Sequence, residues 1–207
     1  MNRYLKKVFI FIFILISASK IYSQADPGIE AAKRGDYVKA VDLLKPVVNK
    51  DDSYEAYYYY GLSLFKTGDM KLAESNLQKA IKKDDEGIGA LTALGNLYSK
   101  QKEYDKADTY FKKALKAEPE DVNVLLARAK NFTVAGKIDD ALPVLALAKS
   151  IDKDNPNVYV GLGDAYYFRR AFSPAEENYN TALKLKPNNP QAHFGLGEIH
   201  FRKKEYT

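Results

Sequence analysis

Residues 90–121 read ALTALGNLYSKQKEYDKADTYFKKALKAEPED, and the pattern of this stretch recurs on both sides of it. Small residues return at intervals of 34 residues, at Gly61, Gly95, Ala129, Gly163 and Gly197. Two series of alanines keep the same interval, namely Ala73, Ala107, Ala141 and Ala175, and Ala80, Ala114, Ala148 and Ala182. A period of this length is typical of stacked helix–turn–helix repeats. The sequence therefore predicts an all-α fold, a solenoid of stacked repeats.

The quoted stretch contains two helices that need each other. Apolar residues recur at helical spacing from Leu91 to Tyr98 and again from Tyr104 to Leu115. Neither helix can bury its apolar face alone, so each repeat is expected to stack on its neighbours. Gly95 and Ala107 are small, and a larger side chain at either position would push the two helices apart. Pro119 has no backbone N–H and should end the second helix.

These features resemble the tetratricopeptide repeat (TPR) family, and more narrowly its exported bacterial members. The chain carries the family's small residue in the first helix, its alanines in the second, and its terminating proline at Pro119 and Pro187. The family's tryptophan is absent, and its place is taken by Tyr57, Leu91, Leu125, Tyr159 and His193. Arg128 departs from the pattern, because the other repeats carry Tyr or Leu there, so looser packing is expected around it. The resemblance implies a right-handed superhelix with a concave, ligand-binding face lined by the first helices.

The repeat spacing also predicts the organisation of the chain. The predicted divisions are a signal peptide (1–23), an atypical capping repeat (24–53), four full TPR repeats (54–87, 88–121, 122–155 and 156–189) and an incomplete repeat (190–207). Pro46 is expected to end or kink the second helix of the capping repeat, and Asp139 and Ser173 are expected N-caps. Because the last repeat lacks its second helix, the sequence favours an N-terminal fragment of a longer protein.

The first 23 residues are typical of a secretory signal peptide. Arg3, Lys6 and Lys7 precede an apolar run from Val8 to Ile16, and small and polar residues follow. Cleavage is expected after Ser23, with Ser19 as the alternative, and an uncleaved amphipathic anchor is the other interpretation. A nine-residue apolar run is too short to span a bilayer, which needs roughly 20 residues. The predicted location is therefore periplasmic or secreted, with no membrane span after cleavage.

Charge and composition argue against nucleic-acid binding and against several chemistries. The signal segment holds four basic residues and no acidic one, which leaves 28 basic against 27 acidic residues in the rest of the chain. No basic cluster stands out, so a nucleic-acid partner is not expected. The chain has no cysteine, which excludes thiol nucleophiles and thiolate metal sites.

No motif for catalysis or for a cofactor emerges. The chain contains no HExxH, no phosphate-binding glycine loop and no GxSxG. His193 and His200 lie seven residues apart, but they occupy two packing positions of their repeat and are expected to be core or interface residues rather than metal ligands. The sequence therefore predicts a non-enzymatic protein without metal or cofactor.

The concave face is the candidate binding site that the resemblance implies. The residues assigned to it are Tyr58, Leu62, Asn96, Lys130, Asp164 and Tyr167. Their mixed character suits an extended peptide or a partner helix. The family subtype that grips a C-terminal carboxylate needs polar residues where this chain has Leu62, Ala93, Ala127 and Gly161, so that mode is not expected.

The predicted function is protein–protein recognition, as a scaffold or assembly factor in the cell envelope. Two alternatives remain open at this point. The repeats would be the recognition arm of a longer envelope enzyme or cell-wall-binding protein whose active domain follows Thr207. Otherwise they would bind a small molecule or glycan through Tyr58 and Tyr167. The sequence does not identify the partner or the oligomeric state.

Overall fold

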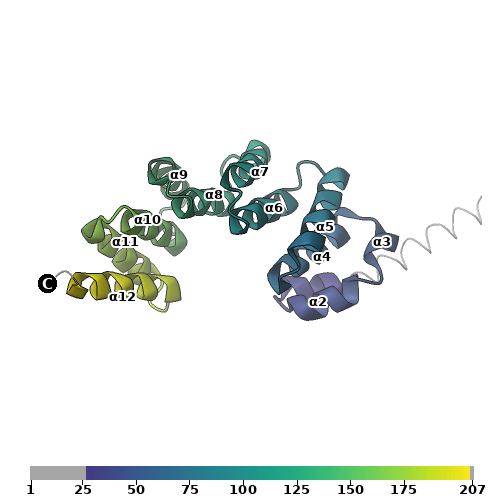
Figure 1. The fold of residues 1–207 in the computed structure, drawn as a ribbon, viewed down its shortest axis with the longest axis horizontal. Helices are drawn as coiled ribbons and strands as arrows, with labels where there is room; N and C mark the ends of the chain where they lie inside the picture. Colours follow the sequence, from purple (N-terminus) through teal and green to yellow (C-terminus); the bar gives the residue numbers. More distant parts are fainter. Residues whose placement is uncertain (1–26, 206–207) are drawn as a thin grey trace, which may run out of the picture. The chain divides into compact units, whose positions relative to one another are not determined.

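The computed structural model describes residues 27–205, and within this range all regular secondary structure is helical (Figure 1). Residues 27–33 form the first helical segment. The others are α2 (Tyr37–Leu44), α3 (Val48–Asp51), α4 (Tyr54–Thr67), α5 (Met70–Lys83), α6 (Ile88–Lys100), α7 (Tyr104–Ala117), α8 (Val122–Val134), α9 (Ile138–Ile151), α10 (Pro156–Phe168), α11 (Phe172–Leu185) and α12 (Pro190–Glu205). This confirms the predicted all-α repeat fold. The predicted signal peptide lies outside the described residues.

The helices form two compact units, divided between Leu94 and Gly95 within α6. In the first unit, α4 packs against α5, and α2 and α3 pack against α4. The expected effect of Pro46 is confirmed, because α2 ends at Leu44 and α3 begins at Val48. Leu44 and Leu77 are fully buried in this unit, so its core is built from the apolar stripes of short amphipathic helices.

In the second unit, each helix packs against the next, from α7 to α12. The first helices of successive repeats also touch, because α10 contacts both α8 and α12. One core cluster centres on Leu125, Leu145 and Val158, and another on Tyr179 and Ile199. The row α8–α10–α12 brings residues that are one repeat apart in sequence to neighbouring positions on one face.

The recurring glycines allow close approach between the two helices of a repeat. A Cβ added at Gly95 would lie 2.5 Å from the ring of Phe111, and one at Gly163 would lie 2.5 Å from the ring of Tyr179. Gly61 stands in the same relation to Leu77, at 2.8 Å. The small residue in the first helix is therefore matched by a large residue in the second.

The turns inside several repeats use a left-handed residue. Gly68 and Gly136 have φ angles of 103° and 75°, and Lys102 and Arg170 occupy the equivalent turns with φ angles of 65° and 61°. Glycine adopts this conformation without the steric cost that a Cβ imposes. Two of these turns are therefore built from a less suitable residue.

The prediction that Asp139 and Ser173 are N-caps is wrong. Helices α9 and α11 begin at Ile138 and Phe172, so Asp139 and Ser173 lie one residue inside each helix, and neither helix has a side-chain cap. Ile138 and Phe172 pack against the core clusters, and this packing draws them into the first turn. Asp139 instead accepts a hydrogen bond of 2.9 Å from Arg169.

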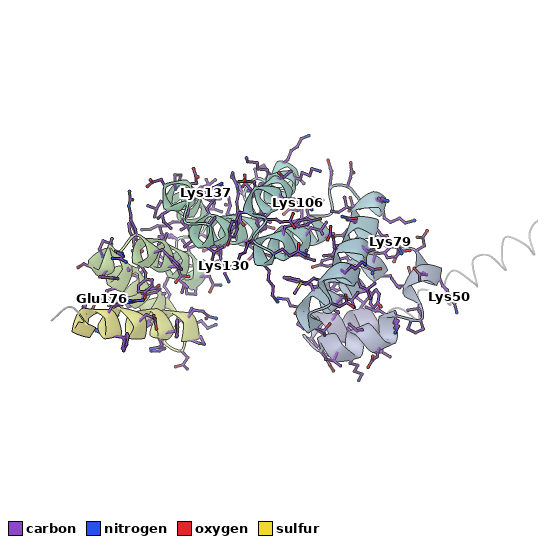
Figure 2. The ribbon with its side chains drawn as sticks, viewed as in Figure 1. Lys50, Lys79, Lys106, Lys130, Lys137 and Glu176 are labelled. Atoms are coloured by element: carbon purple, nitrogen blue, oxygen red, sulfur yellow. The ribbon has the colours of Figure 1, made fainter. Side chains whose placement is uncertain are left out.

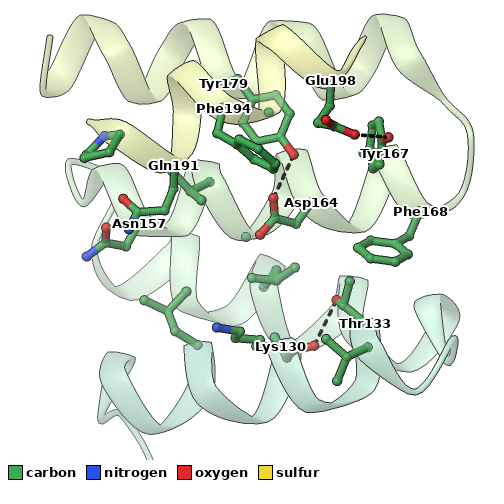
Figure 3. Close-up of a pocket in the computed structure, with 18 residues that line it drawn as sticks. Lys130, Thr133, Asn157, Asp164, Tyr167, Phe168, Tyr179, Gln191, Phe194 and Glu198 are labelled. Atoms are coloured by element: carbon green, nitrogen blue, oxygen red, sulfur yellow. Dashed lines mark hydrogen bonds between the residues drawn. The ribbon is translucent and has the colours of Figure 1, made fainter. Parts of the chain in front are cut away.

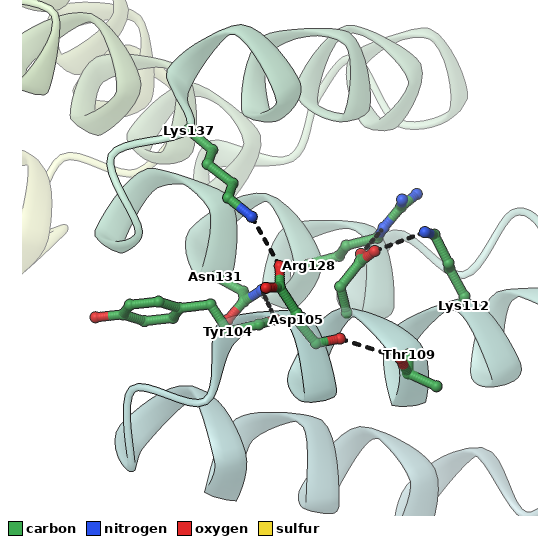
Figure 4. Close-up of polar contacts among 8 residues, drawn as sticks. Tyr104, Asp105, Thr109, Lys112, Arg128, Asn131 and Lys137 are labelled. Atoms are coloured by element: carbon green, nitrogen blue, oxygen red, sulfur yellow. Dashed lines mark hydrogen bonds and ion pairs between the residues drawn. The ribbon is translucent and has the colours of Figure 1, made fainter.

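Arg128 fills its unusual position through polar contacts (Figure 4). Its Nε donates a 2.6 Å hydrogen bond to Oδ1 of Asp108 on α7, and its guanidinium lies 5.2 Å from the centroid of the Phe132 ring. Lys112 also pairs with Asp108, at 2.8 Å. Burial raises the pKa of Asp108, but the hydrogen bonds and charges of Arg128 and Lys112 outweigh it and hold the pKa below the usual range.

Several polar contacts join residues about one repeat apart. The backbone N–H of Ala90 donates to the Tyr54 hydroxyl, 36 residues away, at 3.1 Å. Lys137, labelled in Figure 2, donates to Asp105, 32 residues away, at 2.7 Å. Such contacts fix each repeat to its neighbour within the same compact unit. Over residues 27–205, no helix combines the length and the apolar character that crossing a membrane requires.

Candidate binding groove

The row of first helices in the second unit lines a cavity of about 650 Å³, called here the groove (Figure 3). Helices α8, α10 and α12 form its walls, and side chains from α9 and α11 reach its floor. Its lining residues recur at intervals of 34, as Leu126, Val160 and Phe194, as Lys130, Asp164 and Glu198, and as Thr133 and Tyr167. The repeat period therefore builds the groove, because equivalent positions on stacked helices come together on one surface.

The floor of the groove depends on two glycines that the sequence analysis did not assign to it. A Cβ at Gly161 would lie 2.7 Å from Leu145, and a Cβ at Gly195 would lie 2.3 Å from the ring of Tyr179. Because both positions lack a side chain, Leu145 and Tyr179 reach the groove from the second helices behind it.

Large apolar side chains stand exposed along the walls. Phe194 is 71% exposed, Phe168 is 58% exposed and Val134 is 43% exposed. All three line the groove. Exposed apolar side chains gathered in a concavity are typical of a surface that binds a partner.

A partly buried hydrogen bond positions the first acidic group. The Tyr179 hydroxyl donates to Oδ1 of Asp164 at 2.7 Å. Burial raises the pKa of Asp164, whereas the hydrogen bond from Tyr179 and the charge of Lys130 lower it, and the net direction is upward. Burial and the neighbouring Asp164 also raise the pKa of the Tyr179 hydroxyl, so it remains a donor at neutral pH.

A second hydrogen bond positions the other acidic group. The Tyr167 hydroxyl on α10 donates to Oε2 of Glu198 on α12 at 3.1 Å. Among the described residues that line the groove, Lys130 on α8 is exposed and is the one cationic residue, while Asp164 and Glu198 are the two acidic ones. The groove is therefore an apolar trough with a net negative charge.

The predicted site residues separate between the two compact units. Lys130, Asp164 and Tyr167 come together in the groove. Asn96 lies in the second unit but does not line the groove, whereas Tyr58 and Leu62 lie on α4 in the first unit.

Tyr58 has a packing role that the sequence analysis missed. A Cβ at Gly89 would lie 2.7 Å from the Tyr58 ring, which also stacks on Tyr54 with centroids 5.7 Å apart. Burial raises the pKa of Tyr58 to about 12. A Cβ at Gly87 would lie 2.3 Å from the neighbouring Tyr54 ring. These tyrosines pack against glycines of the following repeat, so part of each ring is already in contact within the protein.

The expectation that His193 and His200 are core residues is wrong, while the alternative that they are interface residues stays a prediction. His193 and His200 are both exposed, because no helix among residues 27–205 covers that face of α12, and the space beside Gly197 is open. Nε2 of His193 lies 2.8 Å from the carbonyl oxygen of Pro187. In this described range, no group of three or more His, Asp or Glu residues is arranged to hold a metal ion.

Comparisons with known proteins agree with this architecture. Models described as "Tetratricopeptide repeat" match residues 27–88 and 89–121, and a model described as "TPR repeat" matches residues 174–204. No curated protein sequence matches the chain.

Several solved structures share the fold. A thermophilic TPR protein of Thermus thermophilus is 19% identical with a TM-score of 0.75, over 87% of this chain and 99% of that one. A tetratricopeptide repeat protein from Parabacteroides merdae ATCC 43184 is 17% identical with a TM-score of 0.72, over 88% and 73%. MamA MSR-1 is 24% identical with a TM-score of 0.64, over 81% and 97%. At such identities the likeness concerns the fold.

Proposed function

Because the chain belongs to the tetratricopeptide repeat family, we propose that it is an exported, non-catalytic scaffold that binds a segment of another protein in the groove. TPR repeats are protein-recognition modules, and stacked repeats present long concave surfaces. The proposal assigns the recognition to α8, α10 and α12 and assigns no catalytic step to any described residue.

The observation that carries the proposal is the exposure of Phe168 and Phe194 inside a concavity of about 650 Å³. A groove of this volume accommodates several side chains of an extended or helical segment. Burying the two phenylalanine rings against a partner would remove a large apolar area from water, which is the main driving force of association.

Export is a separate part of the proposal and rests on residues 1–23. The basic start, the short apolar run and the small residue Ser23 before Gln24 are typical of a secretory signal peptide. Expression of the full chain in a bacterium, followed by fractionation and N-terminal mass analysis, tests it. The expected product begins at Gln24 and is recovered outside the cytoplasm. A product that keeps residues 1–23 and stays in the cytoplasm would contradict export but would leave the groove unaffected.

Groove binding is tested with a displayed peptide library selected against the purified protein. Selected peptides should lose at least tenfold in affinity for Phe168→Ala and Phe194→Ala, because these changes remove apolar contact area. Phe201→Ala is the matched control, since Phe201 also lies on α12 and is 60% exposed but does not line the groove. Equal losses for Phe194→Ala and Phe201→Ala would place the binding surface elsewhere.

A further inference from the structure

We infer that the partner segment is an extended peptide that presents an aromatic or branched aliphatic side chain beside a lysine or arginine. This inference rests on the proposed function, because it specifies the chemistry of the same groove. It follows from three features of the lining: its charge, the way its carboxylates are held, and the position of its apolar walls.

The charge of the groove differs from that of the chain around it. Beyond residue 23 the chain carries 28 basic and 27 acidic residues, so it is close to neutral. The groove instead carries two carboxylates, Asp164 and Glu198, against one ammonium, Lys130. In a concave site with apolar walls, such an imbalance acts strongly on a ligand, since the low local polarity weakens screening.

Both carboxylates are held in place by neutral donors. Tyr179 donates to Asp164 and Tyr167 donates to Glu198. A hydroxyl group orients a carboxylate but leaves its full negative charge, in contrast to the Arg128–Asp108 pair, in which both charges are compensated within the protein. The groove therefore presents oriented acceptors that a cationic side chain can complete.

The partial burial of Asp164 also favours a cationic ligand. Burial raises the pKa of Asp164 more than the hydrogen bond from Tyr179 and the charge of Lys130 lower it, so the compensation of its negative charge within the protein is incomplete. An incoming ammonium or guanidinium group would supply that compensation. An anionic segment would meet two like charges, and a wholly apolar segment would cover both carboxylates without pairing them, which is costly.

The apolar walls determine what accompanies the cation. Phe194 precedes Glu198 by one helical turn on α12, and Phe168 follows Asp164 by one turn on α10 (Figure 3). A peptide whose cation reaches the carboxylates would therefore place a neighbouring side chain against an exposed phenylalanine. The methylene stem of Lys or Arg would also cover ring surface. The side-chain amides of Asn157 and Gln191, one repeat apart, line the same groove and offer donors and acceptors to a peptide backbone.

The test uses four acetylated and amidated eight-residue peptides with a Gly/Ser background. Their central pairs are Phe–Lys, Phe–norleucine, Phe–Glu and Ala–Lys, and binding to the full chain is measured by calorimetry at low and high salt. The Phe–Lys peptide should bind about tenfold more tightly than Phe–norleucine or Ala–Lys, and Phe–Glu should bind most weakly. Salt should reduce the preference for lysine, because it screens the ion pairs.

Three variants connect the preference to the named residues. Glu198→Gln and Asp164→Asn should each bring the affinities for the Phe–Lys and Phe–norleucine peptides within about twofold of each other. Lys130→Met should instead strengthen the binding of the Phe–Lys peptide. Glu198→Gln is the safer variant if Asp164→Asn disturbs folding, and circular dichroism checks both.

The possible failures are distinguishable. If Phe–norleucine or Phe–Glu binds as tightly as Phe–Lys, while Phe194→Ala still abolishes binding, the charge inference is overturned and groove recognition stands. Undiminished binding of all peptides to Phe168→Ala and Phe194→Ala would overturn the proposed function as well. Absence of binding by all four peptides at millimolar concentration would overturn the inferred peptide chemistry.

Discussion

The hydroxyl of Tyr179 on α11 donates a 2.7 Å hydrogen bond to Oδ1 of Asp164 on α10. Leu77, Phe111 and Leu145 occupy the equivalent core position of the other repeats, and none of them has a polar atom. The ring of Tyr179 thus fills the core of its repeat while its hydroxyl orients a carboxylate in the groove. Packing and the chemistry of the groove are coupled through one side chain.

Tyr179→Phe should lower the free energy of unfolding at pH 7 by about 1–2 kcal/mol, because it removes a donor from a partly buried carboxylate. The folded-state pKa of Asp164 is already raised, so its protonated form favours the folded protein. The stability that Asp164 contributes is therefore greatest at low pH and is lost as pH rises through the folded-state pKa. The cost of Tyr179→Phe should accordingly shrink on acidification, as measured by urea unfolding at pH 7 and pH 4. In an Asp164→Asn background the cost should no longer depend on pH over this range.

Gly195→Ala and Gly197→Ala should have opposite effects, although both lie on α12. A Cβ at Gly195 would lie 2.3 Å from the Tyr179 ring, whereas no heavy atom lies within 4 Å of a Cβ at Gly197. Gly195→Ala should cost about 1–3 kcal/mol through overpacking. Gly197→Ala should gain roughly 0.5–1 kcal/mol, because alanine is the better helix former. Thermal unfolding of the two variants checks this, and equal behaviour would contradict the placement of Tyr179 against α12.

Lys102→Gly and Arg170→Gly should each stabilise the protein by about 1 kcal/mol, because both residues have positive φ angles that disfavour a Cβ. The reverse change, Gly136→Ala, should destabilise it by a similar amount. A Cβ added at Gly136 would have no heavy atom within 4 Å. Any loss of stability in Gly136→Ala would therefore report backbone strain alone. Chemical unfolding of the three variants checks the pattern, and a loss of stability in Lys102→Gly and Arg170→Gly would contradict it.

Replacing Arg128 alone with leucine should destabilise the protein by about 1–3 kcal/mol, because Asp108 would lose its guanidinium partner while remaining largely buried. Replacing both Arg128 and Asp108 with leucine should recover most of the stability that the single replacement loses. The next repeat already carries Leu162 and Leu142 at these positions, where they belong to one apolar cluster. A double-mutant cycle measured by urea unfolding gives the coupling, and additive effects would contradict a direct interaction.

The same cycle has a defined pH dependence. The pKa of Asp108 lies below its usual range in the folded protein, so Asp108 contributes stability above its unfolded pKa of about 3.9, and that contribution is lost as pH falls through the folded-state value. The double leucine variant should therefore be less sensitive to acid than the parent protein.

The sequence predicts the paired helices and their glycines well, because a 34-residue period repeats one packing solution. It fails at α9 and α11, where packing of Ile138 and Phe172 overrides the capping preference of Asp139 and Ser173. Helix starts depend on tertiary contacts as well as on local propensity.

The groove could be predicted only in part. The repeat register identifies Lys130, Asp164 and Tyr167, since it places them on the exposed face of first helices. Whether that face is hollow depends on the following repeat. Because Gly89 has no side chain, the Tyr58 ring packs against it. In later repeats the equivalent position is occupied by Asn157 and Gln191, which line the groove. The depth of the groove depends on Leu145 and Tyr179, which reach it because Gly161 and Gly195 have no side chains. It is therefore a property of neighbouring helices rather than of one residue.

The hydrogen bonds between repeats have a consequence for how the chain folds. They join residues about one repeat apart, as in Tyr54 with Ala90, Asp105 with Lys137, and Tyr167 with Glu198, which are separated by 36, 32 and 31 residues. When contacts stay this close in sequence, little loop-closure entropy opposes them, and folding is fast. Each repeat needs only its immediate neighbour, so structure can start at any pair of repeats and spread along the chain. A chain that emerges slowly from one end, from a ribosome or across a membrane, could therefore fold in the order in which its repeats appear.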